Sequence, residues 1–541
     1  MINGGAQIAG VTDLKFTAKT TGTRVLPLGL LPNLRVATVT GEGHREMPFI
    51  QEPVKDDPFF HVILPEPLVA GRSYQLHIEY EGGMVIEKEG NGNFAVGARE
   101  DWYPNLNTFL DHATYDLTFK IPKQFMLVSV GKLAKEWTEG NQACSQWISE
   151  VPLAVAGFNY GSFKKKTLTD KEDKYEIESY ANSELPDYLR NAGQSLALTP
   201  ASMADRALVE SENTIRLYEH WFGTSPYGRI AITQQPQFDF GQSWPTLVYL
   251  PISAFLDSTQ RYSLLGANAF GFQNFIQEVT PHEIAHQWWG HMVGLSSYHD
   301  QWLSEGFAEF SASLYVEATE KPDAVGKFWD RLRDEIAQKN QYGNSPNDAG
   351  PLWLGERLNY SKNPGAYRGM IYPKGAYVLQ MIRSLMRDEK TGDQDFIAMM
   401  KDFVQTYLYK NASSEGFKDT VEKHMKASLD VEGNHRMDWF FRDWIYGTDL
   451  PKYHLDYTIT PADGGKVVFE GKLTQSEVSP DFLMRLPLYF EIDGKWVAAG
   501  RVQVRGSNTA TVKATLPKAP RNVSINLNHD VLAAEISVRK Q

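Results

Sequence analysis

Two histidines, His282 and His286, stand four positions apart in the segment TPHEIAHQWWGHM, and Glu283 directly follows the first. Residues four apart lie on one face of a helix, so both imidazoles can reach a single metal ion at about 2.0–2.1 Å. Glu283 falls on the adjacent face, where its carboxylate can hydrogen-bond a water at the metal without binding the metal itself. The spacing therefore predicts a zinc site with Glu283 as the general base.

The same residues also fit an ordinary helix start. Thr280 would then be the N-cap, Pro281 the first helical residue, and Glu283 the partner that closes a capping box. In that interpretation the histidines carry no function. A third metal ligand is needed to choose between the two.

Glu305 is the candidate for that third ligand, in the segment DQWLSEGFAEF. Ser304 is expected to cap a second helix, and Trp302 and Leu303 to pack beneath the site. A helix, a turn and a returning helix would bring Glu305 beside the histidines, giving three protein ligands and one open position for water. Taken alone, Glu305 equally fits a solvated glutamate in the first turn of a helix.

A zinc pattern with a third histidine is excluded by spacing. It requires glycine at position 289 and histidine at position 292, where this chain has Trp289 and Met292. His291 is therefore expected to be packed, or to support a ligand, rather than to bind the metal.

The hydrophobic pattern predicts a multidomain α+β protein. At 541 residues the chain exceeds the size of a single core. Alternating strands fill an N-terminal β domain over 1–165, a mainly helical catalytic domain spans 166–451, and short strands suited to a β-sandwich follow over 452–541. The charged stretch 164–174 is expected to connect the first two domains, and Asp493 and Gly494 to turn a hairpin.

Composition limits the partners. A net charge of −12 leaves no surplus of cations for nucleic-acid phosphates, so nucleic acid is excluded as a partner. Cys144 is the only cysteine, so any metal must use histidine and carboxylate ligands. No apolar run is long enough for a transmembrane helix, and the protein is expected to be soluble. The compartment, cytoplasmic or exported with a signal absent from this sequence, and the oligomeric state stay open.

The chain resembles the gluzincin aminopeptidases of the aminopeptidase N family, which includes a leukotriene hydrolase. Its stretch HEIAHQWWGHMVGLSSYHDQWLSEGFAEF is similar to the family signature, as are YEHWFGTSPYGRIAI before it and IYPKGAYVLQM and DWIYGTDLP after it. The resemblance implies an N-terminal β domain, a thermolysin-like catalytic domain and a β-sandwich. Many members add a C-terminal helical domain, and the sequence stops before one, so a substrate chamber of that kind is expected to be missing or built differently.

The resemblance also implies site roles. His282, His286 and Glu305 would hold one Zn²⁺ per chain, with Glu283 as base. Tyr372 matches a tyrosine that donates a hydrogen bond to the tetrahedral oxyanion, where charge develops on the former carbonyl oxygen. Taken alone, Tyr372 equally fits a packing residue at a helix start. Glu309 would support the metal ligands, or be a solvated helical glutamate.

The departure from the family lies in amine recognition. The family has a G-x-M-E-N strand whose glutamate binds the substrate's free α-amino group, whereas this chain has FDFGQSWPTLVY, with Gly241 and Gln242 but no glutamate. A second family anchor would fall near NFAVGARE and also lacks its acid. Asp239 or Glu100 would be the substitutes, and the backbone of Gly241 and Gln242 would pair with an extended peptide.

Three functions remain open on sequence alone. The first is a zinc aminopeptidase with an altered amine pocket, acting on a peptide or protein. The second is a zinc peptidase acting on N-blocked, modified or internal peptide bonds. The third is a non-catalytic scaffold of the same fold, which the presence of every ligand, the base and the tyrosine argues against.

Overall fold

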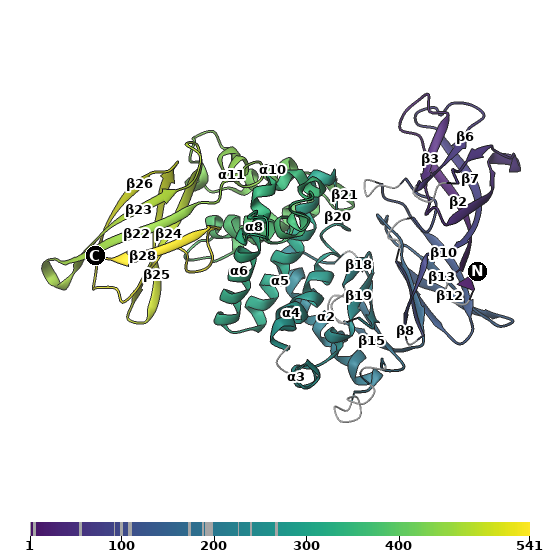
Figure 1. Ribbon diagram of the computed structural model, residues 1–541, viewed down its shortest axis with the longest axis horizontal. Coiled ribbons are helices and arrows are strands. Elements are labelled where there is room, and N and C mark those ends of the chain that lie inside the picture. The colour runs from purple at the N-terminus through teal and green to yellow at the C-terminus, as the bar shows by residue number, and fades with distance from the viewer. Residues whose placement is uncertain are drawn as a thin grey trace. The chain divides into compact units, whose positions relative to one another are not determined.

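The computed structural model describes most of the chain and divides it into two compact units, one of residues 1–215 and 225–287, the other of 216–224 and 288–541 (Figure 1). The described ranges are 2–3, 7–53, 57–90, 92–97, 101–106, 111–170, 175–186, 189, 198–225, 227–237, 241–265 and 269–541.

The first unit begins with antiparallel sheets, as the alternating pattern predicts. In β7 (Ser73–Gly83) the side chains of Leu76, Ile78 and Tyr80 are buried and their neighbours face outward, because successive residues of a strand point to opposite faces. This strand lies between β2 (Gln7–Thr17) and β4 (Leu34–Thr40). The other strands are β1 (Ile2–Asn3), β3 (Val25–Gly29), β5 (Phe49–Ile50), β6 (Phe59–Ile63), β8 (Ile86–Gly90), β9 (Asn93–Val96), β10 (Asp116–Pro122), β11 (Met126–Ser129), β12 (Lys132–Glu139), β13 (Gln142–Ile148) and β14 (Phe158–Gly161).

A five-stranded sheet in the order β15-β16-β17-β19-β18 completes the β-structure of this unit. Its inner strands β16 (Glu176–Asn182), β17 (Arg229–Gln235) and β19 (Leu247–Pro251) run parallel, and every residue of β17 and β19 is buried, as expected for a sheet covered on both faces. The edge strands are β15 (Phe163–Thr169) and β18 (Gln242–Trp244).

The charged stretch that was expected to connect two domains instead supplies strand β15. Residues 163–169 pair antiparallel with β16, and Lys165 forms an ion pair with the buried carboxylate of Glu178. An edge strand tolerates lysines because one side of it faces solvent. The expectation of a connecting loop is therefore wrong for this part of 164–174.

Helices follow the sheet strands as the periodicity indicates. Helix α2 (Pro200–Phe222) stops at Gly223, whose φ of 93° only glycine adopts readily, so this predicted end is confirmed. Helix α3 (Ser258–Leu265) leads to α4 (Ala269–Ala285), which contacts β19.

The second unit contains most of the helices, and α8 (Pro373–Met386) lies at its centre. All residues of α8 are buried, since α5 (Glu305–Thr319), α6 (Pro322–Ala337), α7 (Ala366–Ile371) and α9 (Gln394–Thr406) contact it. Further elements are β20 (Val293–Leu295), β21 (Lys410–Ala412), α10 (Ser414–His424), α11 (Asp438–Trp444) and the 3₁₀ helices η4 (Tyr298–Leu303), η5 (Pro346–Ala349), η6 (Leu352–Leu358) and η7 (Ala427–Leu429).

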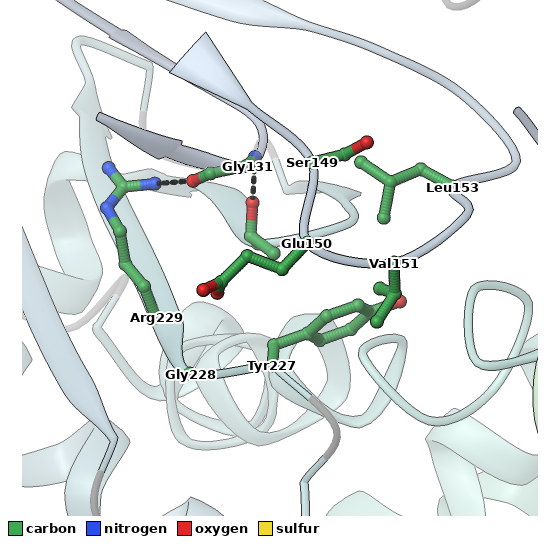
Figure 2. A pocket seen from close by; sticks show the side chains of 9 residues that line it. Gly131, Ser149, Glu150, Val151, Leu153, Tyr227, Gly228 and Arg229 are labelled. Atoms are coloured by element: carbon green, nitrogen blue, oxygen red, sulfur yellow. Dashed lines mark hydrogen bonds between the residues drawn. The ribbon is translucent and has the colours of Figure 1, made fainter. Parts of the chain in front are cut away.

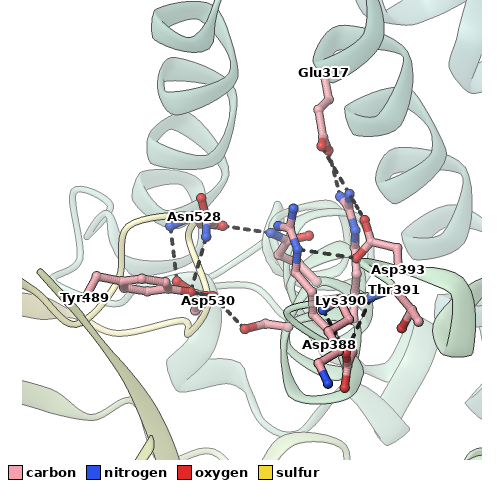
Figure 3. Close-up of polar contacts among 12 residues, drawn as sticks. Glu317, Asp388, Lys390, Thr391, Asp393, Tyr489, Asn528 and Asp530 are labelled. Carbon is pink, nitrogen blue, oxygen red and sulfur yellow. Dashed lines mark hydrogen bonds and ion pairs between the residues drawn. The ribbon is translucent and has the colours of Figure 1, made fainter. Parts of the chain in front are cut away.

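Ion pairs fix the far end of α8. The buried guanidinium of Arg383 donates to Glu317 on α5 at 2.7 Å and to Asp393 before α9 at 2.6 Å (Figure 3). Burial by itself lowers the pKa of Arg383, but these contacts outweigh that effect and raise it. Ser384 donates to Asp530, a residue of the C-terminal β-structure, at 2.6 Å. These contacts join α8 to two helices and to the C-terminal domain.

The C-terminal β-sandwich is confirmed. One sheet has the order β26-β23-β22-β28 and the other β25-β24-β27. Asp493 and Gly494 form the two-residue hairpin loop with φ values of 54° and 75°, the conformation that favours Asp-Gly. The strands are β22 (Lys452–Pro461), β23 (Val467–Ser476), β24 (Leu483–Ile492), β25 (Lys495–Arg505), β26 (Thr509–Leu516), β27 (Val523–Ser524) and β28 (Glu535–Lys540).

In the part of the chain that the structure describes, every helix is too short or too polar to cross a bilayer.

Candidate metal centre

Helix α4 presents the two histidines. It runs from Ala269 to Ala285 with Pro281 in its interior, so the helix-start interpretation of this segment is wrong. The imidazole rings of His282 and His286 lie 5.0 Å apart, centroid to centroid, at 77° to each other. His286 directly follows the last helical residue, so the four-residue spacing still aligns both rings.

Glu305 lies beside these rings as the first residue of α5. The candidate ligand atoms of His282, His286 and Glu305 all lie within 4.8 Å of one another, which confirms the predicted ligand set. Two imidazole nitrogens and one carboxylate oxygen are the ligands of a catalytic zinc, which keeps a fourth position for water or substrate. The residues therefore fit Zn²⁺.

Trp289 holds the start of α5 in place. Its indole packs on Phe307 at 4.9 Å between centroids and donates a hydrogen bond to Ser311 at 3.0 Å. Ser304 is the N-cap residue of α5, as predicted, but its side chain makes no cap hydrogen bond to the helix. Its hydroxyl instead donates to the Trp289 carbonyl at 3.3 Å. Trp302 is fully buried near the site, as expected.

Gln287 ties the histidine segment to strand β18, a role that sequence reasoning missed. Its side chain accepts a hydrogen bond from the Thr246 amide at 2.8 Å and donates to Ser243 at 2.7 Å and to the Trp244 carbonyl at 3.0 Å. The available signal was its place directly after His286. Because Gln287 is fully buried, these contacts fix β18 relative to the metal ligands.

The turn at Thr246 is held from its other side. Its hydroxyl accepts a hydrogen bond from the Gly131 amide at 2.7 Å, and Arg229 donates to the Gly131 carbonyl at 2.8 Å, around the small pocket in Figure 2. None of the metal ligands lines that pocket. The hydrogen bond from the Gly131 amide at its edge holds the turn at Thr246 in place.

Gly241 lies against the carboxylate of Glu283. A Cβ atom placed on Gly241 would come within 2.9 Å of the Glu283 Cδ atom and closer still to Oε1. Only glycine leaves room for this approach of strand and base. The next residue, Gln242, begins the edge strand β18, where an extended peptide can add as a further strand.

Tyr372 stands at the junction of α7 and α8 and is half-buried. The guanidinium of Arg368 lies 5.9 Å from its ring centroid. Helix α8 packs against α5, whose first residue is the ligand Glu305.

The other predicted residues take different positions. Glu309, one turn beyond Glu305, is buried and accepts a hydrogen bond from Arg331 at 3.4 Å, which excludes the solvated alternative. His291 is buried and does not belong to the ligand group that the described residues form. Asp239 and Glu100 fall outside the described residues.

Comparisons with known proteins agree with this geometry. Residues 207–444 match the model described as "Peptidase family M1 domain". The chain is 21% identical to leucyl aminopeptidase of Saccharolobus solfataricus over 439 residues, covering 77% of this chain and 48% of that protein. It is 23% identical to human endoplasmic reticulum aminopeptidase 1 over 479 residues, covering 83% and 46%. The chain thus spans about half the length of these curated relatives.

Solved structures share the fold. The M1 zinc metallopeptidase from Deinococcus radiodurans superposes with a TM-score of 0.61 at 19% identity, covering 83% of this chain and 91% of that one. A mutant of that protein bound to a Tyr-Ser-Ala substrate gives 0.62 at 18% identity, covering 82% and 91%.

Proposed function

The chain belongs to peptidase family M1, and from that premise we propose that it is a zinc-dependent hydrolase of peptide bonds, of the aminopeptidase type with an altered amine pocket. One observation carries the proposal: His282, His286 and Glu305 converge on one point, with Glu283 on the same helix. The family resemblance alone would also fit a scaffold, but a scaffold has no need of an intact ligand set beside a base.

The chain's own residues supply the acid–base steps. Bound zinc lowers the pKa of water and polarises a carbonyl. Glu283 is only 8% exposed, so few solvent molecules compete for its carboxylate. The carboxylate can therefore take the proton of the attacking water. The same group then carries that proton to the leaving amine.

Tyr372 is assigned to the oxyanion. Tyr372 directly precedes α8, which packs against α5, and the first residue of α5 is the ligand Glu305. This placement supports a phenol that donates to the oxygen on which charge develops. Arg368 against the same ring helps to orient the side chain. Glu309 is assigned to support of the ligands, because it is buried on α5 and held by Arg331.

The substrate is proposed to lie along β18. Gln242 opens this edge strand, and Gly241 brings its backbone next to Glu283, so a peptide added there would present its scissile bond to the base. Asp239, three positions before Gln242 in the sequence, is proposed to contact the substrate. The aminopeptidase names of the curated relatives and the tripeptide bound by the Deinococcus structure support a peptide substrate.

A second function is favoured by one specific observation. No glutamate stands in the stretch 238–249, where an aminopeptidase of this family carries its amine anchor. A zinc peptidase acting on N-blocked, modified or internal peptide bonds would need no such anchor. The two functions differ in one measurable property, the dependence of cleavage on a free N-terminus.

Metal content and hydrolysis test the proposal together. The purified chain should bind one zinc per molecule and cleave peptides from a mixed-sequence panel, and chelation should abolish cleavage that added zinc restores. Glu283→Gln should keep the zinc and lose activity by about 10²–10⁴-fold, whereas Glu136→Gln, on exposed strand β12, should match the parent. Absence of stoichiometric zinc together with absence of hydrolysis would support the scaffold instead, whereas full activity in Glu283→Gln would show that Glu283 is not the base.

A further inference from the structure

Three polar side chains of the C-terminal sandwich form a hydrogen-bonded row across the neighbouring strands β22 and β28 (Figure 1). The Ser537 hydroxyl oxygen lies 2.6 Å from Nδ1 of His454, and Oδ2 of Asp456 lies 3.0 Å from Nε2 of the same ring. None of these residues belongs to the metal centre. A serine, a histidine and a carboxylate are thus linked through the two nitrogens of one imidazole.

The strand register places the three groups on one face of the sheet. His454 is opposite Ser537 across the parallel pair, and Asp456 stands two residues after His454 on β22. Residues two apart in a strand point to the same face. The alternate residues Tyr453 and Leu455 are buried, so the row lies on the outer face of the sandwich.

The chemistry of the groups determines where the hydrogens lie. An ionised carboxylate only accepts hydrogen bonds, so Nε2 of His454 carries a hydrogen and donates it to Asp456. The other nitrogen of a neutral imidazole has a lone pair, so Nδ1 accepts a hydrogen bond from the Ser537 hydroxyl. In serine hydrolases a base takes the hydroxyl proton in the same order, while a carboxylate orients the base.

The second oxygen of Asp456 is available to support this role. In the part of the chain that the structure describes, Oδ1 is buried and has no hydrogen-bond partner, whereas Oδ2 accepts from His454. The negative charge of this carboxylate can therefore stabilise an imidazolium that forms while the ring holds a proton.

The edge of the sheet leaves the hydroxyl accessible to a small molecule. Strand β28 is the last strand in the described order β26-β23-β22-β28. The side chain of His454 is 42% exposed, and Ser537 is half-buried. Arg539 is exposed two residues after Ser537 on the same face, opposite Asp456 in register. Its guanidinium can donate to an oxygen that becomes negative beside Ser537.

We propose that Ser537 is a nucleophile independent of the metal centre and that, with His454 as its base, it hydrolyses small esters that have a good leaving group. Asp456 is the positioning residue of this site. An outer sheet face gives a long acyl chain little surface to pack against, so the ester must be small and reactive by itself. The inference goes beyond the proposed peptidase function and does not depend on it.

The proposed reaction has two steps. Oγ of Ser537 attacks the ester carbonyl carbon and passes its proton to Nδ1 of His454. The bond to the leaving oxygen breaks, and that oxygen takes the proton from His454. Water then attacks the acyl-serine and gives one proton to Nδ1, the bond between Oγ and carbon breaks, and Oγ takes that proton back. One ester and one water thus become one carboxylic acid and one alcohol.

A covalent probe tests the nucleophile directly. A fluorophosphonate forms a bond between Oγ and phosphorus and releases fluoride, and mass spectrometry of the zinc-loaded Glu283→Gln protein should find the label on Ser537. His454→Gln in the same background should slow labelling by at least about 10²-fold, the smaller contribution of a positioned base. Ser476→Ala is the matched control, because Ser476 is a half-buried serine on the same face of β23.

Three labelling results would overturn the proposal. They are the absence of label, a label spread evenly over exposed serines, and an undiminished rate in His454→Gln. Because the label is assigned to a residue, none of these results depends on whether the zinc centre cleaves peptides.

Turnover of p-nitrophenyl acetate tests the complete reaction. In the Glu283→Gln background, Ser537→Ala should lower the rate by at least about 10-fold, and adding His454→Gln should lower it no further, because the two residues act as one unit. Melting temperatures should not change. An unchanged rate in Ser537→Ala, or losses that multiply in the double variant, would overturn the site.

Asp456→Asn tests the positioning role. The labelling rate at saturating probe should fall by about 10-fold or more, because an amide no longer holds the ring with Nδ1 free to accept. The half-saturating probe concentration and the melting temperature should stay the same. An intact labelling rate with a lower melting temperature would show that Asp456 only stabilises the sheet.

Discussion

The backbones of α5 and α8 touch at Gly306 and Gly375. A Cβ atom on Gly306 would lie 2.6 Å from the Gly375 Cα atom, and one on Gly375 would lie 2.8 Å from the Gly306 Cα atom. Gly306 follows the zinc ligand Glu305, and Gly375 comes three residues after Tyr372. Because both residues are glycines, α5 and α8 can approach this closely. That close approach sets the distance between the metal ligand Glu305 and the proposed oxyanion donor Tyr372.

We expect Gly306→Ala to damage both stability and activity. The methyl group meets main-chain atoms, which cannot move aside, so the helices must separate at a cost of about 1–3 kcal/mol in the free energy of unfolding. The melting temperature, the zinc content and kcat should all fall. Gly326→Ala on α6 is the control, because its methyl group would have only an ordinary contact at 3.8 Å. Equal melting temperatures for the two variants would contradict the close helix contact.

Gly241→Ala should separate catalysis from stability. Its methyl group meets the flexible end of Glu283, which can swing away without disturbing the fold. We therefore expect a loss of kcat of about 10-fold or more with near-normal zinc content and melting temperature. Gly228→Ala, whose methyl group would lie 3.5 Å from a Glu150 oxygen, should retain full activity. A normal kcat in Gly241→Ala would show that Glu283 does not act from its present position.

Sequence reasoning found the features that depend on local spacing. The four-residue interval between His282 and His286 survives even though the helix ends at Ala285, and the Asp-Gly hairpin at 493–494 follows from two residues that accept positive φ. Pro281 was ambiguous, because proline favours a helix start but is tolerated inside a helix at the loss of one hydrogen bond. Only the packing of neighbouring elements decides whether Pro281 begins the helix or lies inside it.

The features that could not be predicted depend on contacts between residues far apart in the sequence. Nothing near Gln287 in the sequence indicates that it bonds Ser243 and Thr246, and the contact between Gly306 and Gly375 joins two helices that are far apart in the chain. Lysines at 164–166 suggested a connection because hydrophobicity does not separate a solvent-facing edge strand from a loop.

Tyr372→Phe tests the oxyanion assignment. Loss of the phenol hydroxyl should lower kcat by about 10²–10³-fold with little change in KM, because the hydrogen bond strengthens only as charge develops on the oxygen. Zinc content should be unchanged. Tyr377→Phe on α8 is the contrast: its hydroxyl donates to the Trp329 carbonyl at 2.7 Å, so its loss should lower stability and leave kcat intact. A parallel loss of zinc in Tyr372→Phe would indicate a structural role.

Lys374 gives a prediction about stability and pH. This fully buried side chain, two residues after Tyr372, donates to Asn347 at 3.0 Å and to the Gly447 carbonyl at 3.4 Å. Burial lowers the pKa of Lys374 from 10.5 to about 8, and the charge of Asp449 opposes this shift only in part. The folded chain therefore releases the proton at a lower pH than the unfolded chain does.

The sign of the pH effect follows from that order. Between pH 8 and 10.5 the unfolded state binds more protons than the folded state, so the free energy of unfolding gains a contribution that rises with pH, by at most about 3 kcal/mol over the window. Below pH 8 Lys374 is protonated in both the folded and the unfolded state, and the cost of burying its charge lowers the free energy of unfolding by its full amount. Lys374→Met removes this titration, so denaturant unfolding at pH 7.5 and pH 9.5 should show a smaller rise in the variant than in the parent. All other titrating groups act equally in both proteins, and identical pH slopes would show that Lys374 keeps an ordinary pKa in the fold.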